Sequence, residues 1–256
     1  MALREAWWQI RLFWRVPPAA VFTFVLPVAL LLLLYWRRAG DVAFADIGFS
    51  QAVIPGIAAL GVVVACYVNT AIEVAFARDK GILKRLRGTP LPPSAYIAAR
   101  IVSAAGMGTL SALVMILVGV IFFDIQLGWL TVPMVTVALL VGAGCFCALG
   151  LAVASVIPSG EAAPAITNFT LFPLIFFSGM VAPVEDSPRW LTTLASLFPL
   201  RPFAEAMRMS FDSTPPDWGL WASNLALILV WAAVGVLLAL RFFSWLPREP
   251  RSDKVR

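Results

Sequence analysis

Two long apolar stretches of this chain are separated by the basic segment Arg78-Asp79-Lys80-Gly81-Ile82-Leu83-Lys84-Arg85-Leu86-Arg87-Gly88-Thr89-Pro90-Leu91-Pro92-Pro93. Within 78–88, Ile82, Leu83 and Leu86 fall on one face of a helix, and the basic residues lie around the other side. Gly88 is typical of the position after a helix, and the prolines that follow prevent continuation. The segment therefore predicts a short amphipathic helix over 78–88 which, by its charge, lies on the cytosolic side of a membrane.

A basic helix in this position fits three kinds of ligand. The first is anionic lipid, which a positively charged cytosolic loop contacts. The second is the acidic groove of a protein partner, and the third is a nucleotide. The glycines are not spaced as a phosphate-binding loop requires, and no strand pattern precedes them, which argues against nucleotide. Lipid and a protein partner remain open on physical grounds alone.

The composition of the 256 residues indicates a membrane protein. Hydrophobic residues make up 61% and charged residues 13%, whereas soluble domains have roughly 25% charged residues. The chain contains no histidine, which removes the commonest general base and zinc ligand. Its cysteines all lie in apolar stretches, where they are small buried side chains, so we expect no metal site. No groove of basic and aromatic residues for nucleic acid is evident.

Six stretches are apolar and long enough to cross a bilayer as helices, which needs about 20 residues each. They are 19–36, 52–74, 97–123, 129–157, 163–183 and 220–244. We therefore expect a single all-α integral membrane domain over residues 1–256 with six transmembrane helices. Of the 19 Lys and Arg residues, 14 fall on the side that includes both termini and the 78–88 helix, and 5 on the other. The positive-inside rule then predicts a multi-pass protein of the cytoplasmic membrane with both termini in the cytosol.

Two segments outside the spans are also helical by pattern. Residues 3–15 carry Trp and Leu on one face and Arg on another, which predicts an amphipathic interfacial helix at the headgroup level. A cytosolic extension of the first span is the alternative. Residues 184–211 contain helical pieces too short to span, and irregular backbone at membrane depth must be buried in protein or face water. We expect an outer re-entrant helical hairpin here, between spans five and six, with a simple extracellular loop as the alternative.

Polar residues inside the spans are the remaining signal. Span two contains Asn69 and Thr70, and span five contains Thr167, Asn168 and Thr170 beside Phe169, Phe172, Phe176 and Phe177. A mixed amide and aromatic surface suits a large amphiphilic substrate better than an ion. Hydrogen bonding between helices and core packing explain the same residues, because both are common in membrane bundles.

Two motifs follow one another in a fixed order along the chain. From Glu73 to Pro93, an acidic residue ends the second span and a basic helix with Gly, Leu and Arg follows, closed by Thr89-Pro90. The second motif comprises Ser178-Gly179-Met180, Pro183, Ser187-Pro188-Arg189-Trp190-Leu191, Phe198-Pro199-Leu200 and Phe203-Ala204-Glu205-Ala206-Met207-Arg208. Together with the six-span layout, the two motifs resemble the ABC transporter permeases of the type-2 export class (ABC-2), and the resemblance covers nearly the whole chain.

The resemblance implies the membrane subunit of an ATP-driven exporter. The 78–88 segment would be the coupling helix, which rests in a groove of a separate ATP-binding subunit. Its contacts would be Arg78, Lys80, Leu83, Lys84 and Arg87. Glu73 and Arg100 would pair and stiffen the base of this loop, with interfacial snorkelling as the alternative. Spans two and five would line a substrate path between two protomers through Asn69, Thr70, Asn168, Phe169, Phe172 and Phe176.

Cofactors and partners follow from the same resemblance. The chain has no Gly-x-x-x-x-Gly-Lys-Ser/Thr pattern, so we expect no enzyme activity of its own, and ATP and Mg²⁺ would bind in the partner. Two copies of the ATP-binding subunit would serve a permease homodimer embedded in membrane lipid. The cargo would be a hydrophobic or amphiphilic drug, lipid or glycan precursor, and nucleic acid would play no part.

Other functions fit the residues less well. An ion-coupled secondary transporter usually needs a titratable group near the midplane, but Glu73, Asp124 and Glu161 all lie at span ends or in loops. A membrane enzyme lacks its usual parts, because the chain has neither histidine nor paired intramembrane carboxylates. A channel without an ATPase partner is compatible with the composition, yet it leaves the basic helix without a purpose.

Overall fold

The computed structural model describes residues 29, 49–88, 93–123, 128–178, 193, 195–211 and 217–242. Within these ranges every regular element is helical, in agreement with the predicted all-α class. The elements are α4 (Phe49–Val63), η3 (Val64–Val68), α5 (Asn69–Asp79), α6 (Ile82–Arg87), α7 (Pro93–Phe123), α8 (Thr131–Val156), α9 (Ala163–Phe177), α11 (Leu200–Phe211) and α12 (Trp218–Phe242).

Four of the six predicted spans are helices long and apolar enough to cross a membrane. They are Ile54–Asp79, Ala98–Ile121, Thr131–Val156 and Trp218–Phe242. The predicted fifth span, 163–183, is represented by α9, which has 15 residues and is therefore shorter than a full span. The predicted first span (19–36) and interfacial helix (3–15) lie outside the described residues. The structure thus supports a helical membrane protein, and the count of six spans stays a prediction.

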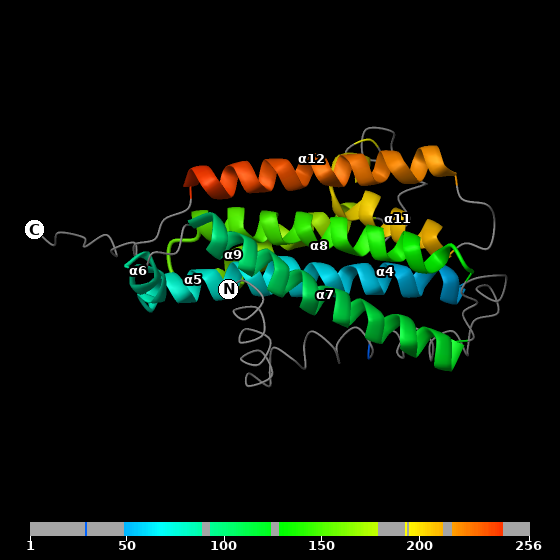
Figure 1. The fold of residues 1–256 in the computed structure, drawn as a ribbon, viewed down its shortest axis with the longest axis horizontal. Helices are drawn as coiled ribbons and strands as arrows, with labels where there is room; N and C mark the ends of the chain where they lie inside the picture. Colours follow the sequence, from blue (N-terminus) through cyan, green and yellow to red (C-terminus); the bar gives the residue numbers. More distant parts are fainter. Residues whose placement is uncertain are drawn as a thin grey trace, which may run out of the picture.

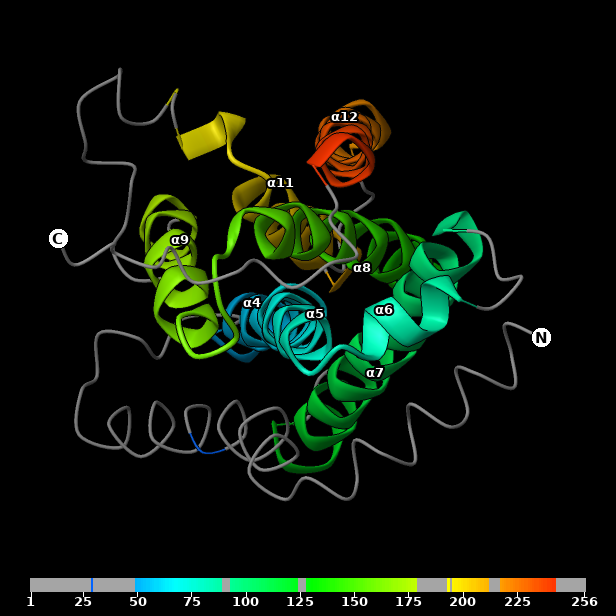
Figure 2. The ribbon, with the colours of Figure 1, turned by 90° about the vertical axis from the view of Figure 1, so that its left-hand side faces the viewer.

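The bundle has an inner and an outer set of helices. Figure 1 shows α8 and the continuous α4–η3–α5 helix running side by side, with α12 along one side of α8 and α7 tilted across the other side of the bundle. Viewed from its end, the bundle has α9 at one edge (Figure 2). In the most apolar part of each span, 67% of Ile54–Asp79 and 61% of α8 is buried, against 33% in α7's span and 22% in α12. The first two therefore form the core, and α7 and α12 offer most of their surface to lipid or to another chain.

Small residues let the inner helices approach closely. A Cβ added at Gly150 of α8 would lie 2.7 Å from the carbonyl oxygen of Tyr67, and one at Gly235 of α12 would lie 2.9 Å from the backbone of Ala148. Contacts of this kind need glycine, because any side chain would collide with backbone that has no freedom to move. Dense packing through small residues replaces the hydrophobic effect as the force that joins helices in lipid.

A π-helical turn, η3, interrupts the second span. The amide of Asn69 donates to the carbonyl of Val64, five residues back, instead of four. The widened turn places buried Cys66 and Tyr67 against the glycine surfaces of α7 and α8, where a Cβ at Gly108 would lie 2.6 Å from Cys66 Sγ. Single π-turns inside helices often occur at functional sites.

Helix α11 belongs to the predicted outer segment 184–211 and lies at the end of the bundle away from α6 (Figure 1). Its Phe203 packs on Phe146, with ring centroids 5.5 Å apart, and against Gly142, halfway along α8. Just before α11, the carbonyl of Leu197 accepts a hydrogen bond of 2.8 Å from the indole of Trp231, in the middle of α12. The chain therefore reaches the middle depth of the bundle near residues 197–203. Because residues 179–192 lie outside the described ranges, the hairpin itself stays a prediction.

Candidate functional site

The predicted helix over 78–88 is two elements separated by a turn. Arg78 and Asp79 complete α5, and Lys80 and Gly81 form a turn in which the amide of Gly81 donates to the carbonyl of Arg78 at 3.0 Å. Gly81 has a φ of +69°, a left-handed conformation that glycine adopts without steric cost. The chain changes direction there, and α6 ends at Arg87, followed by Gly88.

The side chain of Leu83 attaches α6 to the bundle. Leu83 is completely buried and packs with Val74 of α5, Leu151 and Ala154 of α8, and Ala239 of α12. The sequence predicts a partner contact for Leu83, but in this structure the side chain has no exposed surface to offer. The physical reason is that a helix of six residues is held by tertiary packing, and Leu83 supplies a completely buried apolar contact.

The outward face of α6 and of the turn before it is cationic. Lys80 and Lys84 are exposed, as expected, and so are Arg85 and Ile82, which sequence reasoning does not single out as contacts. The ammonium of Lys80 lies 5.6 Å from the ring centroid of Phe76. Arg87 is the last residue of α6, and its side chain is outside the described part of the structure. Because Leu83 is buried, its sequence neighbours Ile82 and Lys84 lie on the outer face of α6.

Arg78 has a different environment from the exposed cations. Its side chain is 2% exposed, and its guanidinium donates to the carbonyl of Ala154 at 3.1 Å and to that of Ile157. It also lies 3.8 Å from the carboxylate of Asp79. This burial disagrees with the expectation that Arg78 is a surface contact, because its donors are directed at the end of α8 instead of outward.

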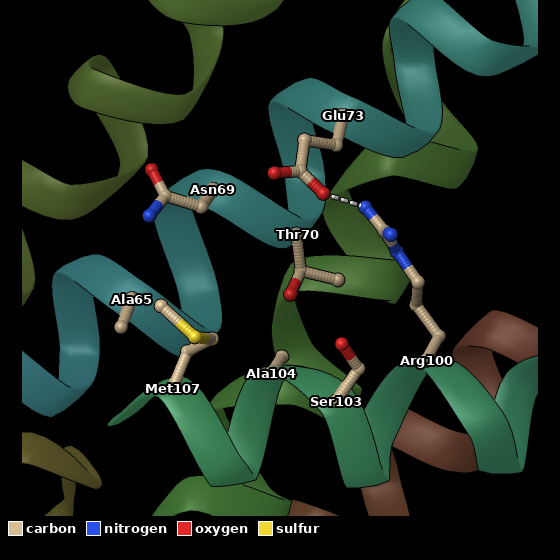
Figure 3. A pocket seen from close by; sticks show the side chains of 8 residues that line it. All are labelled: Ala65, Asn69, Thr70, Glu73, Arg100, Ser103, Ala104 and Met107. Atoms are coloured by element: carbon tan, nitrogen blue, oxygen red, sulfur yellow. Dashed lines mark hydrogen bonds and ion pairs between the residues drawn. The ribbon is translucent and has the colours of Figure 1, made fainter. Parts of the chain in front are cut away.

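Glu73 and Arg100 form the ion pair that the sequence predicts (Figure 3). The pair joins α5 to α7, the two helices that flank the α6 loop. Its side chains are 46% and 13% exposed respectively, so water screens part of the attraction, and pairs of this kind contribute about 0–1 kcal/mol. The pair orients the two helices more than it stabilises the fold.

A narrow pocket adjoins this ion pair between α5 and α7. Its lining consists of Ala65, Asn69, Thr70, Glu73, Arg100, Ser103, Ala104 and Met107. Figure 3 shows Thr70 and Ser103 pointing toward the gap from facing helices. The hydroxyl of Thr70 is buried and has no hydrogen-bond partner among the described residues. Asn69 and Thr70, both predicted path residues, therefore line one polar cleft.

The predicted path residues of α9 lie elsewhere. Asn168 is exposed, and Phe169, Phe172 and Phe176 are 76%, 70% and 58% exposed. These exposed side chains belong to α9, which lies at the edge of the bundle (Figure 2), and none of them lines the polar cleft. A polar contact that sequence reasoning missed joins α9 to the second span, since the hydroxyls of Tyr67 and Thr170 lie 2.7 Å apart. Among the described residues, no three metal-ligating side chains come together.

Comparisons with known proteins agree with this architecture. Residues 5–211 match the protein family described as ABC-2 type transporter. YbhR of Escherichia coli, whose name describes a probable multidrug ABC transporter permease, is 25% identical over 195 residues, which cover 74% of this chain and 51% of YbhR. YvfS of Bacillus subtilis, named as a transport permease, is 26% identical over 172 residues, 67% of this chain and 68% of YvfS. The chain thus spans about half the length of YbhR. Because the family match extends over most of the sequence, this chain belongs to the ABC-2 type transporter family.

Proposed function

We propose that the chain is the membrane-spanning permease subunit of an ATP-driven exporter, powered by a separate ATP-binding subunit. The observation that carries this proposal is the arrangement of α6. A short helix at one end of the bundle is fixed by buried Leu83 and exposes Lys84 and Arg85 to solvent. An element that is rigidly attached yet outward-facing suits the transfer of a push from a soluble partner to the membrane helices.

The proposed docking face consists of the exposed Lys80, Ile82, Lys84 and Arg85, and Arg87 stays a predicted contact. Ile82 is 46% exposed and lies between Lys80 and Lys84 in the sequence, so a complementary groove would combine acidic side chains with an apolar floor. Charge complementarity raises association rates and selects the partner. ATP and Mg²⁺ would bind in that partner, and two copies of it would serve two copies of the permease.

The proposed cargo is hydrophobic or amphiphilic. The support is the aromatic surface of α9, which a single chain leaves uncovered, together with the multidrug designation of YbhR. A second permease copy that packs near this surface would place the aromatic rings of α9 and the polar cleft of α5 along one route. Aromatic and amide groups together bind amphiphiles of varied shape without a fixed charge.

A charge-reversal experiment tests the docking face. Lys84→Glu is compared with Arg241→Glu, which makes the same change of charge at an exposed position at the end of α12, on the same end of the molecule (Figure 1). The permease is purified from its host membranes, and ATP hydrolysis by the material that copurifies with it is measured. Efflux of a fluorescent amphiphilic dye is followed in inverted vesicles. We expect Lys84→Glu to reduce both readouts at least tenfold and Arg241→Glu to leave both near the wild-type value.

Two results would contradict the proposal. The first is wild-type permease that copurifies with no ATP-hydrolysing subunit under mild solubilisation. The second is equal loss of activity in the two variants, which would assign the effect to net charge at the membrane surface instead of to docking.

A further inference from the structure

The last two residues of α5 both reach the turn that connects α8 to α9. The guanidinium of Arg78 donates to the carbonyls of Ala154 and Ile157. The carboxylate of the next residue, Asp79, accepts the amide of Gly160. The base of the α6 loop is therefore bonded to a turn about 80 residues further along the chain, through a cation on one side and an anion on the other.

At the end of α8, the carbonyl of Ala154 lacks the donor that a continuing helix would supply. Residue 158 would normally donate its amide to the carbonyl of Ala154, but it is Pro158 and has no N–H. Arg78 supplies the missing donor. The amide of Gly160 lies in the turn that leads into α9, and Asp79 supplies its acceptor.

Apolar side chains of α5 also pack closely against the α8–α9 turn. A Cβ at Gly160 would lie 2.8 Å from the ring of Phe76, so the turn lies directly on that ring. Ala71 and Ala75 of α5 form a buried cluster with Ile157 and Ala163, which flank the turn. Closely packed surfaces transmit displacement because they have no voids to collapse into.

From this geometry we infer that Arg78 and Asp79 are positioning residues that fasten the α8–α9 turn to the base of α6. This inference rests on the proposed function. When an ATP-binding subunit displaces α6, the Arg78–Asp79 pair moves α8 and α9 together with α5. The polar cleft on α5 and the aromatic surface of α9 then respond to one push, although no residue of α9 is among those that line the cleft.

The first test uses the purified permease alone. Hydrogen exchange is measured for the peptide that covers 157–163 in wild type, Asp79→Ala, Asp79→Asn and Arg241→Ala. Loss of a hydrogen bond to a charged group should raise exchange by about tenfold or more in Asp79→Ala. Asparagine keeps an acceptor oxygen and should restore most of the protection, and Arg241→Ala should match wild type. Exchange in Asp79→Ala that equals wild type overturns the fastening.

The second test uses the permease in vesicles with its ATP-binding subunit. Transport of a fluorescent amphiphilic dye is divided by ATP hydrolysed, in the same variants and in Arg78→Gln. We expect Asp79→Ala and Arg78→Gln to bind the subunit and hydrolyse ATP while dye moved per ATP falls about tenfold, with partial rescue in Asp79→Asn. Raised exchange with unchanged dye per ATP overturns the coupling role. Wild-type permease that binds no ATP-binding subunit overturns the proposed function, and the exchange result still decides whether the turn is fastened.

Discussion

Gly150 faces the carbonyl oxygen of Tyr67 in the π-turn, at a distance that excludes any side chain. Alanine there would push backbone against backbone and should destabilise the fold by about 1–3 kcal/mol. Gly144 lies on the same helix, and a Cβ added there would meet nothing within 4 Å, so Gly144→Ala should be neutral or stabilising by up to about 1 kcal/mol through helix propensity. Thermal unfolding in detergent compares the two variants. Equal unfolding temperatures would contradict close packing at Gly150.

At the residue scale, the sequence predicts which side chains interact better than it predicts which side chains are buried. The family resemblance, together with the position of both residues near the ends of adjacent spans, implies that Glu73 and Arg100 pair. The structure contains this ion pair, and its role in supporting the loop stays a prediction. The family resemblance assigns Arg78 to a partner surface together with the other cations of the 78–88 segment. The buried Arg78 donates to carbonyls at the end of α8 and in the turn after it, almost 80 residues away, and no local pattern records that relation.

A polar contact between η3 and α9 permits an element-scale prediction. Tyr67 and Thr170 share a hydrogen bond of 2.7 Å, and Thr170 lies close to the carbonyls of Ile166 and Thr167 as well. Hydrogen bonds between membrane helices contribute about 0.6 kcal/mol on average and up to about 1.7 kcal/mol. A double-mutant cycle of Tyr67→Phe and Thr170→Val, followed by chemical unfolding, should give a coupling energy in this range. Strict additivity of the two substitutions would show that the contact does not join the helices.

Adjacent residues of α6 separate attachment from docking. Leu83→Ala removes a completely buried side chain, and such truncations cost about 2–5 kcal/mol. We expect α6 to detach, so that hydrogen exchange over 80–88 rises at least tenfold. Ile82→Ala should leave that exchange unchanged, because Ile82 is 46% exposed, and should weaken binding of the ATP-binding subunit. If Leu83→Ala leaves exchange over 80–88 as in wild type, packing does not hold α6.

Elements with a strong composition signal are predicted well. Helix α8 (Thr131–Val156) is expected over 129–157, and α12 (Trp218–Phe242) over 220–244, because continuous apolar stretches are bounded by turn residues. Two interruptions have no such signal. The pattern over 78–88 predicts one helix and does not show the break at Gly81. The apolar pattern of the second span does not predict η3, since one extra residue per turn leaves the apolar composition of a span unchanged.

At the scale of the whole molecule, the proposed orientation assigns the two ends of the bundle to opposite sides of the membrane. Helix α6 and the α8–α9 turn lie at one end, and the turn before α8 lies at the other (Figure 1). Single cysteines at Lys84 and Ser159 should react with a membrane-impermeant thiol reagent only from the cytosolic side, and one at Trp129, which is 86% exposed, only from outside. The native cysteines are 0% exposed and should give no background. Reaction of Lys84→Cys from outside would reverse the proposed orientation.

The path residues show why the site was harder to predict than the fold. The positions of the spans follow from the length and hydropathy of apolar stretches, which can be read from a single sequence. Whether Asn69 and Asn168 meet depends on how helices pack, and in one chain they lie on different surfaces. The exposed rings of Phe169 and Phe172 are compatible with a second copy, which no single-chain pattern specifies.

The bond between Arg78 and Ala154 also bears on how the protein is made. Ala154 is synthesised 76 residues after Arg78, so the second span enters the bilayer before the acceptor carbonyls exist. On the proposed cytosolic orientation, the guanidinium would remain hydrated at the membrane surface during that interval and would favour keeping its end of the nascent helix on the side of the ribosome. Its two bonds to the end of α8 and the following turn can form only after that later segment has been synthesised. On this proposal, one arginine would act first as a topogenic signal and then as an interior hydrogen-bond donor.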